Sequence, residues 1–397
     1  MSAGIGEYAS HVGGSGIREI VNLVVARPPG EIDRLEIGEP DFTTPVHITE
    51  AAMRRALDGV GYTQSAGLAE LRTLLARRLH EASGLDYHPD DVIVTAGGVQ
   101  ACQLVMAATL SPGDEVLVPD PAWPNYEMLA TLAGARAVHY PLPADRGFVA
   151  DPAEIAALIT DRTRLLVLNS PGNPTGAVFP PAVVREIVEV CAARDVLVLS
   201  DEVYDELIFD GTPANAIGVD RDHVIGVYSF SKTYAMTGWR VGYVASPSWL
   251  APTLWRVQEP LVSCVSEVSQ AAAMAALTGP REEVDAMRES YRRRRDLVVG
   301  LLRAEGIEVV VPDGAFYVMV SFAAGVDSRR ACIELVERGV SLAPGTAFGS
   351  VAASFARISL SASEPVLRRG LARLASWYRE TEGGARPALG RVGAVTS

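Results

Sequence analysis

Short apolar segments alternate with longer amphipathic segments through the middle of the chain. The amphipathic segments have the spacing of helices. Continuous apolar runs are typical of strands that are buried on both faces of a sheet. The predicted strands are residues 92–95, 115–118, 165–168, 196–199, 224–228 and 240–244, and the predicted helices are residues 99–110, 125–133 and 182–194. This alternation predicts an α/β fold in which helices cover both faces of a mostly parallel sheet.

The pattern changes after Gly279 and Pro280. The sequence then predicts a long charged helix over residues 281–304, strands at 308–311, 316–320 and 357–359, and a helix at 330–338. These elements predict a smaller α+β domain. The first 45 residues are expected to join it, because they precede the first regular strand–helix unit. The predicted division is a large domain at 46–280, a small domain at 1–45 plus 281–380, and a flexible tail at 381–397.

Composition narrows the classes of partner. Among 397 residues, 48% are hydrophobic and the net charge is −13, which fits a globular protein and argues against nucleic acid or an anionic membrane as partner. No apolar run reaches the ~18 residues of a membrane helix. No export signal is visible, so we expect a cytoplasmic protein. The cysteines form no CxxC pair and the histidines no HExxH motif, so no disulfide scaffold or metal site is expected. The arginine run 292–295 is interpreted as a solvated helix face.

Lys232 is the only lysine in the chain, although the sequence contains 35 lysine and arginine residues together. Arginine stays protonated in proteins, whereas a lysine amine can lose its proton and attack a carbonyl carbon. Mutational bias toward arginine is the alternative explanation. The retained lysine therefore suggests a nucleophile. The residues around it must decide between this role and mutational bias.

Polar residues follow several predicted strands at the point where each strand ends. Gly97 and Gly98, Asn173, Asp201 and Lys232 all occupy such positions. In open parallel sheets, ligands bind at the carboxyl ends of the strands. The spacing therefore predicts that these residues share one binding site.

Each of these residues also has an ordinary structural explanation. The two glycines could let backbone N–H groups approach a phosphate, or could form a plain strand–helix turn. Asp201 could pair with a ring nitrogen or cap a helix. Asn173 lies in an Asn/Pro/Gly cluster that is usually just a turn.

Further side chains nearby fit a cofactor that has a phosphate and an aromatic ring. Arg240 suits a phosphate, although a lone arginine is usually a surface residue, and Ser229 could add a hydroxyl donor. Tyr204 could donate to a ring hydroxyl or pack in a core. Trp123 could stack on a ring or simply fill space.

Four longer stretches together resemble a known family. The sequences NSPGNPTG, SDEVYDEL, SFSKTYAMTGWRVGY and PDGAFYV are similar to those of the class I/II aminotransferases, which are pyridoxal-phosphate enzymes of fold type I. The resemblance extends from Gly38 to Ser359, nearly the whole chain. It implies a large domain with a seven-stranded sheet, a smaller domain, and a homodimer with shared active sites. It also implies transfer of an amino group between an amino acid and a 2-oxo acid by a ping-pong cycle.

The resemblance implies a role for each matching residue. Lys232 would bond covalently to pyridoxal phosphate and act as the base, Asp201 would hold the ring nitrogen, and Tyr204 would bind the ring's phenolic oxygen. Asn173 would share that oxygen and contact the substrate. Arg357 would bind the substrate's α-carboxylate with help from the backbone of Gly38. The remaining cofactor residues would be Gly97, Gly98, Val99, Ser229 and Arg240 at the phosphate, Trp123 on the ring, and Tyr62 at the phosphate of the neighbouring subunit.

Substrate choice and reaction type stay open at this stage. Some family members that accept acidic substrates carry a lysine where this chain has Val99. This difference favours a neutral or aromatic amino donor in one half-reaction, although an arginine elsewhere could serve an acidic substrate. A pyridoxal-phosphate lyase or cyclase on the same scaffold is the main alternative. A transcription regulator with an aminotransferase-like domain is disfavoured by the acidic charge and by the absence of a basic helical module before residue 38.

Overall fold

The computed structural model describes residues 4–323 and 325–381, and its centre is a sheet of seven strands. Their order is β2-β8-β7-β6-β5-β3-β4, and β8 alone runs antiparallel to its neighbours. The strands are β2 (Val92–Thr95), β3 (Glu115–Asp120), β4 (Arg136–Pro141), β5 (Thr163–Asn169), β6 (Leu197–Asp201), β7 (Val224–Ser229) and β8 (Gly242–Ala245). The prediction of a mostly parallel α/β sheet is confirmed.

Both faces of the central sheet are apolar, because successive strand residues point to opposite sides. In β5, Leu166 and Leu168 belong to one hydrophobic core, whereas Leu165 and Val167 belong to the other. The first core is covered by α3 (Val46–Leu57), α4 (Ala69–Ser83), α7 (Pro152–Leu158), α8 (Pro181–Ala192) and α11 (Glu267–Thr278). The second core is covered by α5 (Gly98–Thr109), α6 (Asn125–Leu132) and α10 (Ala251–Val262). Burial on both faces explains the uninterrupted apolar runs of the sequence.

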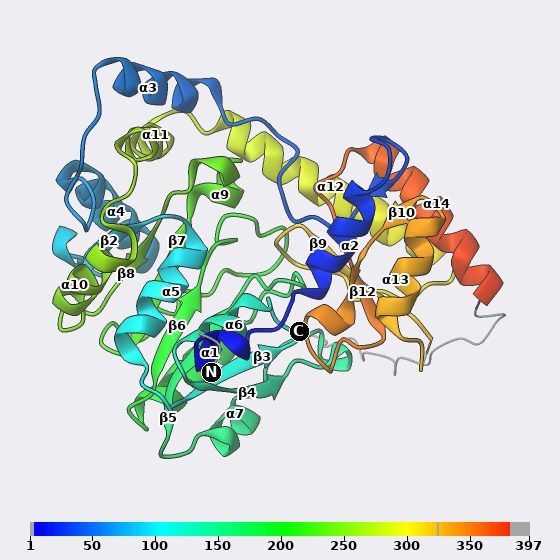
Figure 1. Cartoon of the computed structure of the whole chain (residues 1–397), viewed down its shortest axis with the longest axis horizontal. Coiled ribbons are helices and arrows are strands. Elements are labelled where there is room, and N and C mark those ends of the chain that lie inside the picture. Colours follow the sequence, from blue (N-terminus) through cyan, green and yellow to red (C-terminus); the bar gives the residue numbers. More distant parts are fainter. Residues whose placement is uncertain (1–3, 324, 382–397) are drawn as a thin grey trace.

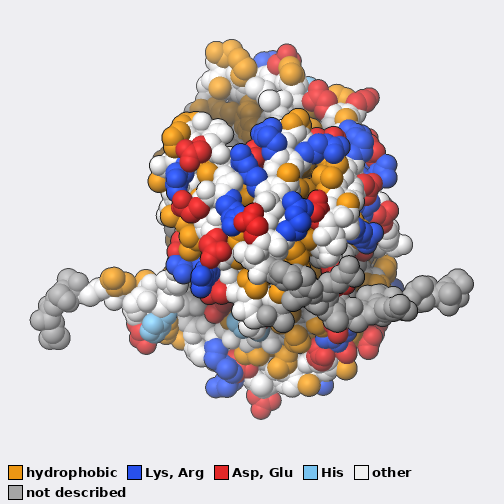
Figure 2. All heavy atoms as spheres, turned by 90° about the vertical axis from the view of Figure 1, so that its right-hand side faces the viewer, with side chains coloured by type: hydrophobic (Ala, Val, Ile, Leu, Met, Phe, Trp, Pro, Cys, Tyr) orange, Lys and Arg blue, Asp and Glu red, His pale blue; other side chains and the backbone are white. Residues whose placement is uncertain are grey.

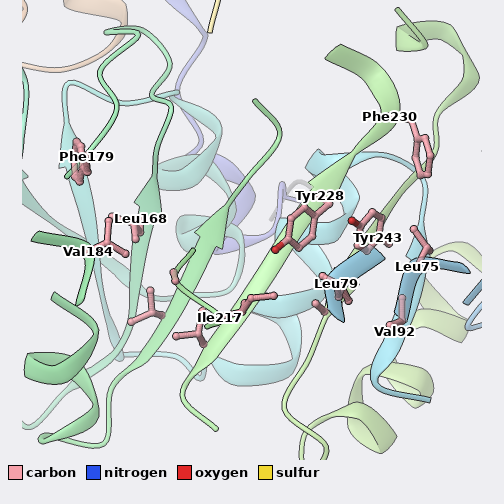
Figure 3. Packing of buried hydrophobic residues seen from close by; sticks show 14 of the residues in the cluster. Leu75, Leu79, Val92, Leu168, Phe179, Val184, Ile217, Tyr228, Phe230 and Tyr243 are labelled. Atoms are coloured by element: carbon pink, nitrogen blue, oxygen red, sulfur yellow. The ribbon is translucent and has the colours of Figure 1, made fainter. Parts of the chain in front are cut away.

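The first core holds the end of β7 in place. Tyr228 of β7 stacks on Tyr243 of β8 with ring centroids 4.7 Å apart, and Leu75 and Leu79 of α4 close this core from the helix side (Figure 3). The chain passes directly from β7 into the short helix α9 (Phe230–Thr233). Packing beneath β7 therefore fixes the starting point of the segment that carries Lys232.

A second group of elements lies beside the central sheet, on the right in Figure 1. It contains an antiparallel sheet in the order β11-β12-β9 and a two-stranded parallel sheet in which β1 pairs with β10. Its strands are β1 (Asp33–Arg34), β9 (Tyr317–Ser321), β10 (Val340–Ser341), β11 (Ala343–Pro344) and β12 (Phe355–Ser359). Its helices are α2 (Gly16–Val25), α12 (Glu282–Ala304), α13 (Ser328–Glu337) and α14 (Glu364–Thr381). The N-terminal segment thus packs with the C-terminal third of the chain.

Short helical segments complete the description. They are α1 (Glu7–Ser10), η1 (Pro89–Asp91), η2 (Ala144–Arg146), η3 (Thr237–Trp239) and η4 (Gly345–Ala347). The domain boundaries near residues 45 and 280 stay a prediction. The expected tail lies outside the described residues except for Thr381, which ends α14.

Two predicted strands need correction. Residues 308–311 form only an isolated bridge, in which Val309 pairs with Val320. The strand expected from residue 240 begins at Gly242, because Arg240 has a left-handed backbone conformation with φ of 53°. Such a residue cannot continue a pleated strand.

The interpretation of the arginine run as a solvated face is wrong for two of its four residues. Arg292 and Arg293 are exposed, but Arg294 and Arg295 are only 7% and 5% exposed. Arg294 donates to both carboxylate oxygens of Asp41, at 2.7 and 2.9 Å, and to the carbonyl of Leu360. This ion pair ties the loop at residues 38–42 to α12.

The molecular surface carries charges of both signs. Figure 2 shows acidic and basic side chains interspersed on the face formed by the second group of elements, and ion pairs such as Arg338–Glu380 lie there. Among the described residues, no helix is both long enough and apolar enough to cross a bilayer.

We expect Asp41→Asn to lower the free energy of unfolding by about 2–3 kcal/mol. Breaking a buried ion pair leaves a charge without its partner, and the cost lies at the lower end here because the Asp41 side chain is 30% exposed. Asp285→Asn is the matched control. Asp285 forms an exposed ion pair with Arg288 on α12, the helix that carries Arg294, and its substitution should change the free energy of unfolding by less than about 0.5 kcal/mol. Urea titration measures both variants. Equal effects would contradict the anchoring role of Asp41.

Candidate active site

A cavity of about 520 Å³ lies where the central sheet meets the second group of elements. Asn169, Asp201 and Ser229 line it, and they are the last residues of β5, β6 and β7. The cavity therefore occupies the carboxyl edge of the parallel strands. Eleven of the predicted site residues line it, namely Gly38, Gly98, Val99, Trp123, Asn173, Asp201, Tyr204, Ser229, Lys232, Arg240 and Arg357. Gly97 and Tyr62 do not.

Lys232 lies one turn after the end of β7, in α9, and its side chain is partly buried. Its Nζ donates to the carbonyl oxygen of Gly38 at 2.7 Å. Burial, together with the positive charges of Arg357 and Arg240, lowers the pKa of Lys232 to about 8. Roughly a tenth of the amine is therefore unprotonated at pH 7, far more than for an ordinary lysine, and the unprotonated form is the nucleophile.

Asp201 is a buried acid with hydrogen bonds but no cationic partner at ion-pair distance in the described structure. The hydroxyl of Tyr126 donates to its Oδ2 at 2.5 Å, and the backbone N–H of Val203 donates to Oδ1 at 3.2 Å. Burial raises the pKa of Asp201 to about 6, although both hydrogen bonds act in the opposite direction. The carboxyl group is thus still mostly an anion at neutral pH, and it attracts a positive charge within the cavity.

Arg357 is a cation buried in β12, only 2% exposed. Its two terminal nitrogens donate to neutral oxygens, the side-chain Oδ1 of Asn173 at 2.8 Å and the carbonyl of Glu36 at 2.6 Å. Nε has no partner, and no carboxylate of the described residues lies at ion-pair distance. A buried charge without a counter-charge is costly. The site therefore favours an anionic ligand at Arg357.

Aromatic rings fix the position of Arg357. Its guanidinium carbon lies 4.3 Å from the ring centroid of Tyr317 and 4.8 Å from that of Phe348. The Tyr317 hydroxyl lies 2.9 Å from that of Tyr204. It also occupies the space beside Gly38, where an added Cβ would lie 2.1 Å from the hydroxyl oxygen. Only glycine fits at position 38, so its backbone can reach the cavity.

The opposite part of the cavity is suited to a phosphate. Gly97 precedes α5 with φ of 85°, and a Cβ there would lie 2.4 Å from Nη2 of Arg240. Arg240 donates to the carbonyls of Thr237 and Ala96, at 2.9 and 3.1 Å. Unpaired N–H groups at a helix start attract anions, and the neighbouring guanidinium adds a positive charge. Glycine at position 97 allows the guanidinium of Arg240 to approach the start of α5.

The remaining predicted residues occupy different environments. The ring of Trp123 meets that of Tyr126 edge-on, with centroids 5.4 Å apart. Val99 contributes an apolar side chain at the start of α5. Tyr62 is 94% exposed and does not line this cavity within the single chain.

Sequence analysis missed several residues that line the cavity. Tyr126 lies at the start of the predicted helix 125–133, and its closeness in sequence to Trp123 was the one signal that could have pointed to it. Ser231 and Tyr317 lie within the quoted motifs and were not singled out. Arg18 comes from α2, and Ser15 directly precedes this helix, which was not predicted. No motif marks this helix, and its position depends on tertiary packing.

Comparison with known proteins agrees with this geometry. The sequence profile of the family "Aminotransferase class I and II" matches residues 32–374. The chain is 39% identical to the aspartate/prephenate aminotransferase of Thermus thermophilus, over 89% of this chain and 92% of that protein. It is 40% identical to an arginine–pyruvate transaminase of Pseudomonas aeruginosa, with the same coverage. The solved structure of aspartate aminotransferase from Thermus thermophilus with maleate has a TM-score of 0.91 and 37% identity, covering 94% of this chain and 99% of that chain.

We expect the amine of Lys232 to react with formaldehyde and cyanoborohydride with a pH midpoint near 8. An exposed lysine would have its midpoint near about 10.4. Because Lys232 is the only lysine, peptide mass spectrometry needs to separate it only from the α-amino group. The measurement uses protein from which any bound aldehyde has been removed, and a lysine-containing model peptide is the control. A midpoint equal to that of the peptide would show that the cavity does not perturb the amine.

Proposed function

The chain belongs to the class I and II aminotransferase family and is an aminotransferase, and we propose that it works with pyridoxal phosphate bound in the cavity at Lys232. The observation that carries the proposal is the meeting of three ionisable groups in one cavity. These are the chain's only lysine with a lowered pKa, the buried Arg357 without a counter-anion, and the buried Asp201 without a counter-cation. The lysine suits the aldehyde of the cofactor, Arg357 suits the carboxylate of a substrate, and Asp201 suits a protonated ring nitrogen.

The residues present fit this cofactor. A volume of about 520 Å³ is within the usual range for small-molecule pockets. Ser229, Arg240 and the backbone of Gly97, Gly98 and Val99 would hold the phosphate at the start of α5. Asp201 would hold the ring nitrogen, Tyr204 and Asn173 the phenolic oxygen, and Trp123 the face of the ring. When bound, pyridoxal phosphate supplies an aldehyde and an electron-withdrawing ring that accepts the electrons of the substrate Cα–H bond.

Lys232 has two tasks in this proposal. Its Nζ would be the nucleophile that holds the aldehyde of the cofactor, and it would accept the Cα proton of the substrate and return it. A base works best when its pKa lies near the working pH. Burial and the neighbouring guanidinium groups supply that match by lowering the pKa of Lys232 to about 8.

Asp201 would stabilise the positive charge of the cofactor ring, and Arg357 would orient the substrate. A positive charge beside Asp201 favours its ionised form, and the hydrogen bond from Tyr126 fixes the direction of the carboxyl group. The guanidinium of Arg357 would bind the α-carboxylate of the substrate, which fixes the Cα–H bond relative to Nζ of Lys232. Asn173 already contacts Arg357 and would contribute to the same site.

We propose a homodimer with shared active sites. Large apolar side chains are exposed along α3 and the following loop, among them Val46, Met53, Leu57 and Val60. A patch of this kind is typical of a protein–protein interface. Tyr62 follows this patch directly, and we propose that it reaches the phosphate in the neighbouring subunit. Cytoplasmic location stays a prediction.

The decisive experiment is a half-reaction. Holoenzyme mixed with an amino acid but no 2-oxo acid should release about one equivalent of 2-oxo acid per site and then stop, as expected for a cofactor that keeps the amino group. Addition of a second 2-oxo acid should restart it. Continued release of product without an acceptor would instead indicate a lyase.

Three variants test the residue roles in this assay. Lys232→Ala should abolish the reaction and the absorbance of the lysine-bound cofactor. Asp201→Asn should slow it by at least about 100-fold, the usual cost of losing a preorganised charge. Glu202→Gln is the control, because burial raises the pKa of Glu202 to about 8 and glutamine mimics its neutral form. Near-normal rates for Asp201→Asn would refute its role.

We expect Arg357→Lys to lower kcat/KM for amino acids by about 100-fold, because lysine cannot form the bidentate contact with a carboxylate. A primary amine that lacks a carboxylate should react equally slowly with the variant and the wild type. Steady-state kinetics with both kinds of substrate measures the difference. A similar loss for the amine would mean that Arg357 supports the fold of the site and does not bind the carboxylate.

A further inference from the structure

One cation of the cavity wall has no role in the proposed function. Arg18 lies in the first turn of α2, and it lines the cavity together with Ile17 and Val21. Residues three and four positions apart share one face of a helix. Ile20 and Val24 lie beside Ile17 and Val21 on the apolar face of the helix, and they are buried in the core of the second group of elements. Arg18 lies at the edge of this face, three positions before Val21, and its side chain lines the cavity.

The guanidinium of Arg18 forms no ion pair with the acidic residues near it in the described structure. Its neighbour Glu19 pairs with Arg329, and the cavity residue Glu39 accepts a hydrogen bond from the hydroxyl of Thr237 at 2.7 Å. Within residues 4–323 and 325–381, the guanidinium of Arg18 has no hydrogen-bond or ion-pair partner. Arg18 is exposed, so its guanidinium is open to solvent and to a ligand that enters the cavity.

Arg18 and Arg357 are attached to the same scaffold. The start of α2 packs on η4, where a Cβ added to Gly16 would lie 3.0 Å from the Cβ of Ala347. The next residue, Phe348, lies under the guanidinium of Arg357 at 4.8 Å. The second group of elements thus presents two guanidinium groups to one cavity. Lys232, Asp201 and the phosphate-binding residues face it from the central sheet.

We propose that Arg18 binds the second carboxylate of a dicarboxylic substrate, an amino diacid or the corresponding 2-oxo diacid, whose first carboxylate binds Arg357. This inference rests on the proposed function, because it assigns the substrate class of the same site. Guanidinium groups bind carboxylates through paired, charge-assisted hydrogen bonds. The side chain of Val99 is apolar and offers a carboxylate no anchor, whereas Arg18 can supply one. The carboxylate of Glu39 is the one competing feature, since it would favour a cationic substrate.

The test compares Arg18→Gln with Arg18→Lys in the holoenzyme. For glutamate and 2-oxoglutarate, Arg18→Gln should lower kcat/KM by about 10- to 100-fold, the loss expected for a charge-assisted hydrogen bond. For alanine and pyruvate the change should stay below about 3-fold, because these substrates lack the second carboxylate and lose no such bond. Arg18→Lys should recover part of the loss, since it retains the charge. Calorimetry with succinate gives a readout that needs no turnover, and its dissociation constant should rise with Arg18→Gln by a similar factor.

Several outcomes would overturn the inference. The first two are an equal loss of kcat/KM for diacids and neutral substrates in Arg18→Gln, and no loss for either. The third is a wild type that does not use diacids. The fourth is an Arg18→Gln variant that gains activity with a cationic donor such as arginine and keeps its wild-type activity with diacids. Failure of the proposed function looks different. In that case no amino acid releases a 2-oxo acid, while the succinate titration still reports whether Arg18 binds a second carboxylate.

Discussion

The burial of a guanidinium without an anion beside it is the constraint on which this site depends. Arg357 satisfies two of its nitrogens with neutral oxygens and is flanked by Tyr317 and Phe348, but its charge stays uncompensated. Placing an unpaired charge in a protein interior costs several kcal/mol. The two apolar cores of the central sheet and the core around β9 and β12 must offset that cost. Burial lowers the pKa of Lys232, and the charge of Arg357 lowers it further, so this buried cation contributes to both substrate binding and proton transfer.

The elements that the sequence predicted well are those buried on both faces. β2, β6 and β7 contain continuous apolar runs because their apolar side chains are buried on both faces of the sheet, and polar residues appear only where the strands end. The edge strand β4 was not recognised, since only Tyr140 among its six residues is buried and Arg136 and His139 are exposed. The predicted strand at 308–311 has β-branched residues but finds a partner only at Val309. Periodicity describes burial, so it fails where an element is half exposed.

Some residues of the site could likewise be predicted from the sequence, whereas others could not. Residues at strand ends, such as Asp201 and Asn173, could be expected to meet because parallel strands bring their carboxyl ends to one edge. Tyr126, Tyr317 and Arg18 reach the cavity from elements whose packing no local pattern specifies. Tyr62 is a further case, because the proposed role involves a second copy of the chain.

The loop at residues 38–42 joins two distant parts of the molecule. The carbonyl oxygen of Gly38 accepts a hydrogen bond from Nζ of Lys232, and three residues later Asp41 forms an ion pair with Arg294, which lies 253 positions away along the chain. When that nitrogen changes its bonding, the hydrogen bond to the loop must break or shift. Because Asp41 pairs with Arg294, this loop is also anchored to α12. A change in the bonding of one nitrogen atom therefore acts on a segment that connects the central sheet with the second group of elements.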